Sequence, residues 1–170
     1  MATNFEVEMT FGSSADEVFA MFCDPKYLEL RCAETGGIDI EVSSAVDAAG
    51  GAVLSMKRSV PAEVPSFAKS FVGDTIEIDE THTWSPPASD GSREAAITCS
   101  FGGLPVGFTG QASLVDSGDG PADDRTTFHL DASVKAAIPL MGGKIEGVVR
   151  DQTLRATAKE NKVARGWLAT

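Results

Sequence analysis

The feature that most constrains the fold is a change of pattern near residue 140. Between residues 38 and 138 the chain consists mainly of segments in which apolar and polar side chains alternate, as in half-buried strands. Short connections rich in Gly, Pro, Ser and Asp join these segments and favour antiparallel pairing. From about Gly143 to Leu168, apolar residues recur instead at the spacing of one face of a long helix. Helices kept apart from an antiparallel sheet indicate an α+β fold.

The bounds of the elements follow from the same two periods. Ser14 and Glu17 have the spacing of a capping box, which predicts a helix that begins there and stops before Pro25. The strands are predicted at 4–11, around 38–42 and 54–60, and at 75–84, 93–101, 106–115 and 125–138; the other helices are predicted at 26–34 and 143–168.

Two connecting segments have their own signals. Phe67 and Phe71 lie four residues apart in a segment bounded by prolines, which predicts a short helical turn or a packed loop. Plain core packing is the favoured role of these phenylalanines, and a place on the rim of a cavity is the alternative. The low-complexity piece 117–124 is predicted to be the tip of a hairpin.

Composition favours one domain over residues 1–170, because 170 residues with 42% hydrophobic side chains suffice for one sizeable core. A net charge of -11 argues against nucleic acid and anionic lipid surfaces as partners. The start of the chain lacks the pattern of a signal peptide, and no apolar run approaches the ~20 residues of a membrane span. We therefore expect a cytoplasmic protein with no stable membrane insertion, whose partner is a small neutral or hydrophobic molecule or another protein. The oligomeric state is left open.

The strand at 75–84 combines apolar and charged positions on one face. Because side chains alternate along a strand, the face of Ile78 also carries Glu80 and His82. Arg58 interrupts the apolar face of the preceding strand in the same way, and an ion pair between Arg58 and Glu80 would relieve the cost of burying both charges. The alternative is that a bulge or a one-residue slip turns Glu80 and His82 outward.

A curved sheet with a long helix across its concave side leaves a space between them, and such spaces commonly hold ligands. The residues expected to form the apolar wall of this space are Met56, Ile78, Phe108, Val149, Thr153 and Ala156. The residues expected to orient a ligand are Arg58, Glu80, His82 and Gln152, with Glu160 as a further polar partner. Tyr27, Leu28 and Arg31 are candidates for the rim.

Motifs for metal, phosphate or nucleophilic chemistry are not found. The two histidines and three cysteines have no metal-ligand spacing, and no serine lies in a G-x-S-x-G elbow. The stretch "IPLMGGKIEGVV" lacks the longer cradle and the Ser or Thr after Lys144 that a phosphate loop needs. Its glycines, Gly142 and Gly143, are predicted to turn the last strand into the helix. No catalytic residue and no cofactor is predicted.

Five stretches carry a resemblance to a known superfamily: "SADEVFAMFCDPKYLELR", "VPSFAKSFVGD", "TIEIDETHTW", "IPLMGGKIEGVVRDQ" and "ARGWLA". Through them the chain resembles the START-like, or SRPBCC, superfamily, which includes birch-pollen allergen-like, lipid-transfer and polyketide cyclase/dehydrase-like proteins. More narrowly, it looks like a branch of unknown function found chiefly in actinobacteria. The resemblance implies a helix-grip fold, in which six to seven antiparallel strands wrap around a long C-terminal helix and two short helices follow the first strand. It also implies a deep apolar cavity.

Three functions remain open at this stage. The first is a binding protein for a lipid-, sterol- or polyketide-like molecule. The second is an enzyme of cyclase or dehydratase type, with His82 and Glu80 as its acid and base. The third is a protein-interaction module whose cavity is filled by side chains. Cavity volume separates the third from the others, because pockets for small molecules usually have roughly 300 to 1,000 Å³.

Overall fold

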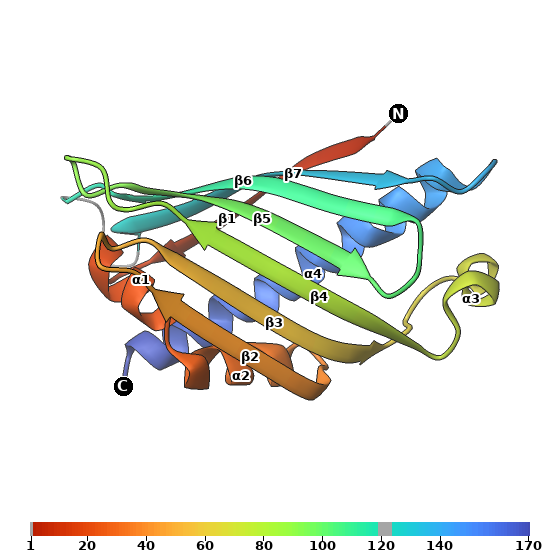
Figure 1. Ribbon diagram of the computed structural model, residues 1–170, viewed down its shortest axis with the longest axis horizontal. Helices are drawn as coiled ribbons and strands as arrows, with labels where there is room; N and C mark the ends of the chain where they lie inside the picture. The colour runs from red at the N-terminus through yellow and green to blue at the C-terminus, as the bar shows by residue number, and fades with distance from the viewer. Residues whose placement is uncertain (1, 119–123) are drawn as a thin grey trace.

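One strongly curved antiparallel sheet dominates the structure (Figure 1). The computed structural model describes residues 2–118 and 124–170. Seven strands pair in the order β1-β7-β6-β5-β4-β3-β2. The strands are β1 (Thr3–Phe11), β2 (Ile38–Val46), β3 (Ala52–Pro61), β4 (Thr75–Trp84), β5 (Arg93–Phe101), β6 (Val106–Asp116) and β7 (Thr126–Ala136); the helices are α1 (Ala15–Phe22), α2 (Pro25–Glu34), α3 (Ser66–Val72) and α4 (Gly142–Leu168).

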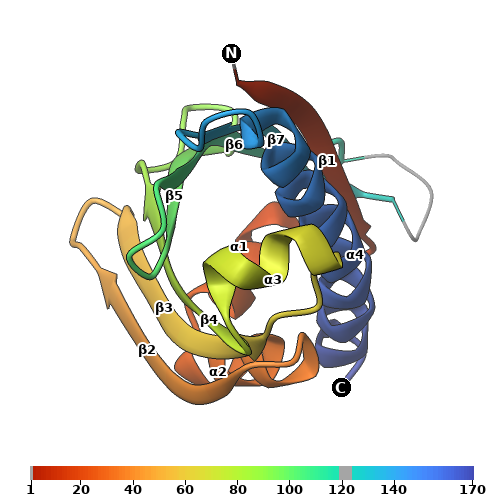
Figure 2. The ribbon, with the colours of Figure 1, turned by 90° about the vertical axis from the view of Figure 1, so that its right-hand side faces the viewer.

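The helices close the open side of the curl. Helix α4 runs along it against β1, β7 and α2, while α3 lies across one end (Figure 2). The predicted α+β helix-grip arrangement is therefore confirmed, including the two short helices after the first strand. No helix in the described part of the chain is both long enough and apolar enough to cross a bilayer.

The two short helices begin where their caps place them. The Ser14 side chain accepts a hydrogen bond from the Glu17 amide, and the Glu17 carboxylate accepts one from the Ser14 amide, as in a capping box. The Asp24 side chain caps α2 by accepting a hydrogen bond from the Lys26 amide, and Pro25 occupies the first helical position. These caps let the chain reverse twice within a short distance, which brings both helices under the sheet beside α4.

Glu80 and His82 point into the concave side of the sheet. Strand β4 pairs with β3 without a break in register, so that Glu80 lies opposite Met56 and His82 opposite Leu54. Residues opposite each other share a face, and both Met56 and Leu54 are fully buried on the concave face. The interpretation that a bulge or slip turns Glu80 and His82 outward is therefore wrong. The irregularity lies in β2 instead, between Ile38 and Glu41.

One end of the space inside the sheet is filled by aromatic side chains. The Phe22 ring lies 5.9 Å from the rings of both Trp84 and Phe128, and 6.1 Å from that of Phe11. Ring pairs at such distances pack densely. This aromatic end closes the interior beneath α1 and α2.

Helix α3 differs from its favoured prediction. Phe67 and Phe71 were expected to pack in the core, but they are 36% and 45% exposed, and only Ala68 of this helix is buried. Phe67 and Phe71 share one face of this short helix, and the face that packs against the protein is that of Ala68 instead. The predicted hairpin tip at 117–124 falls largely on residues 119–123, which lie outside the described residues.

The turn into α4 does not place Gly142 or Gly143 in the left-handed backbone conformation. Leu140 has the left-handed backbone conformation at this turn, with φ of 65°. Gly142 is required for close approach instead, because a Cβ at this position would lie 2.7 Å from the carbonyl oxygen of Ala136. An added Cβ at Gly143 would meet nothing within 4 Å.

Substitution by alanine is therefore expected to have opposite effects on stability at Gly142 and at Gly143. Gly142→Ala should lower the free energy of unfolding by about 1 to 3 kcal/mol, because backbone must shift to make room. Gly143→Ala should raise it by about 0.5 to 1 kcal/mol, because alanine is the better helix former. Urea unfolding followed by circular dichroism measures both. Equal effects of the two substitutions would contradict the close approach.

Candidate functional site

A cavity of about 650 Å³ lies between the concave face of the sheet, α2 and α4. Of the predicted cavity residues, nine line it: Arg58, Ile78, Glu80, His82, Phe108, Val149, Gln152, Thr153 and Ala156. Met56 does not, because its sulfur lies against the guanidinium of Arg31, which covers it. The three rim candidates, Tyr27, Leu28 and Arg31, also line the cavity, whereas Phe67 and Phe71 do not.

The two sides of the cavity differ in polarity. The side formed by β1, β5, β6 and β7 is apolar and includes Val7, Met9, Ile97, Phe108 and Leu130. Glu63, Arg155 and Lys159 line the cavity where they are exposed to solvent. The side formed by α2, β3, β4 and α4 carries five largely buried Arg, Glu and His side chains, namely Arg31, Arg58, Glu80, His82 and Glu160. We call these five residues the charged wall.

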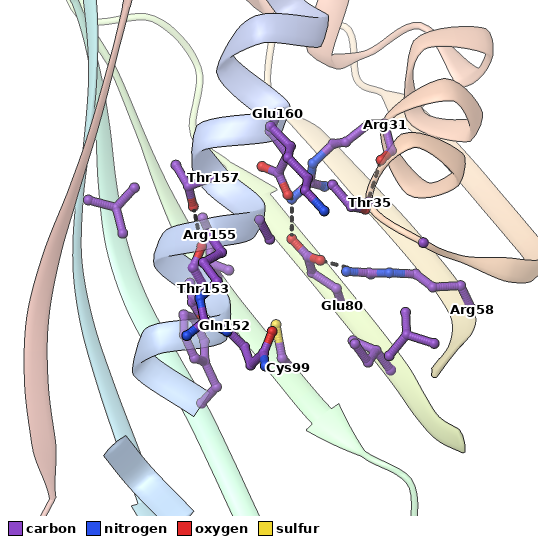
Figure 3. A pocket seen from close by; sticks show the side chains of 18 of the residues that line it. Arg31, Thr35, Arg58, Glu80, Cys99, Gln152, Thr153, Arg155, Thr157 and Glu160 are labelled. Atoms are coloured by element: carbon purple, nitrogen blue, oxygen red, sulfur yellow. Dashed lines mark hydrogen bonds and ion pairs between the residues drawn. The ribbon is translucent and has the colours of Figure 1, made fainter. Parts of the chain in front are cut away.

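Glu80 is the centre of the charged wall (Figure 3). Its carboxylate lies 2.9 Å from Arg31 Nη2 and 2.9 Å from Arg58 Nη1. The Nε2 atom of His82 lies 2.6 Å from the carboxylate oxygen that contacts Arg31. Only 5% of Glu80 is exposed. Its carboxylate is nevertheless ionised, because its pKa is lowered in the folded protein.

The surrounding charges keep Glu80 ionised. Burial alone would raise the pKa of Glu80, but the guanidinium groups of Arg31 and Arg58 and the hydrogen bond with His82 hold this pKa well below its usual range. Glu80 is consequently a poor proton donor at neutral pH. Its chemical role in the cavity is that of a fixed negative charge.

Arg31 joins the sheet to the long helix. Its Nη2 atom contacts Glu80 on β4 and lies 3.1 Å from Glu160 Oε1 on α4. Burial would lower the pKa of Arg31, but Glu160 and Glu80 raise it well above its usual range. The sequence placed Arg31 only at the rim. Its position four residues after Tyr27 and three after Leu28 puts it on the buried stripe of α2, which is the signal for its central place.

The two polar cavity residues of α4 already have partners. The side-chain amide of Gln152 donates a 2.7 Å hydrogen bond to the Glu63 carbonyl in the segment between β3 and α3. The hydroxyl of Thr153 donates to the Val149 carbonyl one turn earlier, at 2.8 Å. Gln152 thus ties α4 to the segment beside the cavity, and Thr153 has its hydroxyl proton engaged within the helix.

The cavity contains a thiol, but not a reactive one. Cys99 pairs with Glu80 across β4 and β5 and lines the cavity. Burial, with the negative charge of Glu80, raises the pKa of the Cys99 thiol well above its usual value. The nucleophilic thiolate is therefore disfavoured.

His129 lies outside the cavity, as the alternation of β7 predicts. Together with Glu6 and Asp131 it offers ligand atoms that all lie within 4.8 Å of one another. The two carboxylate residues are exposed, and acidic groups of this kind are common on protein surfaces without an ion. We assign no metal site to them.

Comparison with known proteins confirms the fold. The model of a family described as "Protein of unknown function (DUF2505)" matches residues 6–168. Uncharacterized protein Rv0481c of Mycobacterium tuberculosis is 22% identical over 175 residues, which cover 99% of this chain and 98% of the relative.

Two solved structures illustrate the shared architecture. The Zhui aromatase/cyclase from Streptomyces sp. R1128 is 12% identical with a TM-score of 0.66, covering 99% of this chain and 94% of that one. Norcoclaurine synthase from Thalictrum flavum, in complex with dopamine and hydroxybenzaldehyde, is 15% identical with a TM-score of 0.57, covering 99% and 88%. These likenesses confirm the START-like helix-grip fold, which in these relatives supports ligand binding and cyclase-type chemistry.

The pairing around Glu80 predicts a large effect of one isosteric substitution. Glu80→Gln should lower the free energy of unfolding at pH 7 by about 3 kcal/mol or more, because it leaves two buried guanidinium groups without their shared carboxylate. Since the pKa of Glu80 is lowered in the folded protein, its contribution is complete above its unfolded pKa of about 4.3. The difference between wild type and variant should therefore shrink as the pH falls through the folded-state pKa.

The matched control is Glu77→Gln on the same strand. Glu77 is about half exposed and pairs with Lys57 on the outer face, so its loss should have a much smaller effect. Urea unfolding from pH 7 down to pH 3 measures both variants. A Glu80→Gln effect as small as that of Glu77→Gln would show that the charged wall contributes little to the fold.

Proposed function

This chain belongs to the DUF2505 family of proteins of unknown function, and we propose that it binds a small hydrophobic molecule in the cavity between the sheet and α4. The observation that carries the proposal is the cavity itself. Its volume of about 650 Å³ falls within the range of small-molecule pockets. The third function considered from the sequence, an interaction module with a filled interior, requires side chains where this space is.

The lining supports an amphipathic ligand. A hydrocarbon or aromatic body fits against Phe108 and Leu130, and Val149 and Ala156 extend the apolar surface from α4. A polar group of the ligand fits against the charged wall. The proposal thus covers lipid-, sterol- or polyketide-like molecules. Within it, residues 1–170 act as one domain in the cytoplasm, without membrane insertion and without a cofactor.

Of the four residues expected to orient a ligand, Gln152 has a different role in this proposal. Arg58, Glu80 and His82 remain the proposed polar contacts, since all three line the cavity. Gln152 is a weaker candidate because its amide is bonded to Glu63. We assign Gln152 the task of holding the segment before α3 against the helix.

A second candidate function is supported by the contact between His82 and Glu80. A histidine held 2.6 Å from a buried carboxylate, beside a cavity, is an arrangement suited to proton transfer. An enzyme of cyclase or dehydratase type would use His82 as the group that moves the proton. Glu80, kept ionised by two guanidinium groups, would position the imidazole rather than act as an acid.

The binding proposal predicts that filling the cavity abolishes ligand uptake. Ala156→Trp places a large side chain into the cavity from α4 and should reduce the binding of the neutral fluorescent probe N-phenyl-1-naphthylamine at least about tenfold. Leu154→Trp is the control, because Leu154 lies on the same helix, is 41% exposed and does not line the cavity. Probe fluorescence titration gives both dissociation constants. Equal binding by the two variants would place the binding site elsewhere.

A carrier and an enzyme are distinguished by whether the protein returns its natural ligand unchanged or converts it. Native mass spectrometry of the purified protein, followed by extraction, should reveal a bound hydrophobic molecule. Incubated with that molecule, a carrier should bind it saturably and return it unchanged. Conversion of the molecule by wild type, with loss of conversion but retained binding in His82→Ala, would establish the enzyme instead.

A further inference from the structure

Arg58 differs from the other members of the charged wall in its unused donors. Arg31 donates to Glu80, and His82 shares its Nε2 atom with the same carboxylate. Arg58 Nη1 lies 2.9 Å from Glu80, but this contact lacks the geometry of a hydrogen bond. Neither Nη1 nor Nε has a hydrogen-bond partner in the described part of the chain, and both atoms are covered by protein. The third nitrogen, Nη2, makes no hydrogen bond with the described residues either, but it is not covered, so it is the donor that a ligand in the cavity can reach.

Buried N–H donors that lack an acceptor lower the stability of the folded protein. An arginine carries five N–H donors, and a buried donor without an acceptor destabilises the folded state. Arg58 is 9% exposed and lines the cavity. Other buried nitrogens without partners, Trp84 Nε1 and Arg93 Nε, belong to residues that do not line it. An acceptor on a ligand would thus pair with Arg58 Nη2, the accessible donor of this guanidinium.

The charge of the wall limits what that acceptor is. Within the charged wall, the guanidinium groups of Arg31 and Arg58 face the two carboxylates of Glu80 and Glu160. Arg155 and Lys159 also line the cavity, but they are exposed and their charges are screened by solvent. A carboxylate on the ligand would add a third negative charge close to Glu80. A neutral oxygen accepts the same hydrogen bonds without this repulsion. The charged wall therefore has an accessible unused donor, and it contains as many carboxylates as guanidinium groups.

The surroundings of Arg58 fix where the oxygen would lie. Val60, Ile76 and Ile78 line the cavity beside Arg58 on β3 and β4. Gly37 lies against the stem of the arginine, since a Cβ at this position would be 3.2 Å from Arg58 Cγ and 2.7 Å from the Cys32 carbonyl oxygen. The side chain is thereby held along the wall, with its guanidinium directed towards Glu80 (Figure 3).

We infer that Arg58 is the residue that recognises the ligand, and that the group it recognises is an uncharged oxygen acceptor, such as a ketone or another carbonyl, on an otherwise apolar molecule. This inference rests on the proposed binding function and deepens it. It names the chemical class of the ligand and makes Arg58, which is held in place by Glu80, the contact that selects this class.

Three naphthalenes of similar size test the inference: 2-acetylnaphthalene carries a neutral carbonyl, 2-ethylnaphthalene carries no acceptor, and 2-naphthoate carries a carboxylate. Their dissociation constants are measured by displacement of N-phenyl-1-naphthylamine from wild type, Arg58→Met and Lys57→Met. Lys57→Met is the matched control, because it removes a positive charge from the outer, half-exposed face of the same strand.

The expected result is a change in one ratio. The dissociation constant of 2-ethylnaphthalene divided by that of 2-acetylnaphthalene should fall about tenfold in Arg58→Met, which corresponds to one hydrogen bond from a charged donor. The ratio should stay unchanged in Lys57→Met, and 2-ethylnaphthalene should bind all three proteins alike. In wild type, 2-naphthoate should bind more weakly than 2-acetylnaphthalene.

Several results would overturn the inference. An unchanged ratio in Arg58→Met would show that Arg58 does not contact the acceptor. Tightest binding of 2-naphthoate would show that the recognised group is an anion. If Arg58→Met does not fold, the double variant Arg58→Met/Glu80→Gln replaces it, since it removes the same donors without leaving the Glu80 carboxylate short of a partner, and Arg31 keeps Glu160; an unchanged ratio there overturns the inference equally. Failure of the dye and all three naphthalenes to bind wild type would instead contradict the proposed function.

Discussion

The pairing of buried charges around Glu80 is the interaction on which the rest of the structure depends. Arg31 reaches Glu80 on β4 and Glu160 on α4, so one side chain from α2 connects the sheet to the long helix. None of these charges can be buried without its partners. The separation of helix and sheet here is consequently set by the length of extended arginine and glutamate side chains. Close apolar packing would have drawn the two together, and the charged wall keeps them apart.

The distribution of side-chain volume explains why the interior is filled at one end and hollow at the other. Phe22, Trp84 and Phe128 occupy the aromatic end beneath α1 and α2. Further along α4, the positions facing the sheet are small or polar, such as Thr153 and Ala156, and cannot span the gap. The cavity therefore exists because α4 places small and polar side chains towards this part of the sheet. The aromatic end gives the fold a densely packed core that does not require a bound ligand.

Alternation predicted the strands and the inward face of β4, because the period of two is a local property of an extended chain. It could not decide between an inward and an outward Glu80, since only the continuous pairing of β3 with β4 excludes a slip. Met56 shares its face with Arg58 but is covered by Arg31, a contact that depends on where α2 packs. The exposed phenylalanines of α3 show the same limit: hydrophobicity predicts burial, but which face of α3 is buried depends on how the helix packs, and here it is the face of Ala68.

The irregularity in β2 has a consequence for the edges of the sheet. The strand order leaves two edges, and α4 packs against the strand at one of them, β1. At the other edge, the register of β2 shifts between Ile38 and Glu41, and Asp39 adopts a φ of 53°. A regular row of free amides and carbonyls is a template for aggregation, and a bulge interrupts it. The distortion at Asp39, together with the acidic side chains of Asp39 and Glu41, thus acts as a stop that disfavours the addition of a further strand from another molecule.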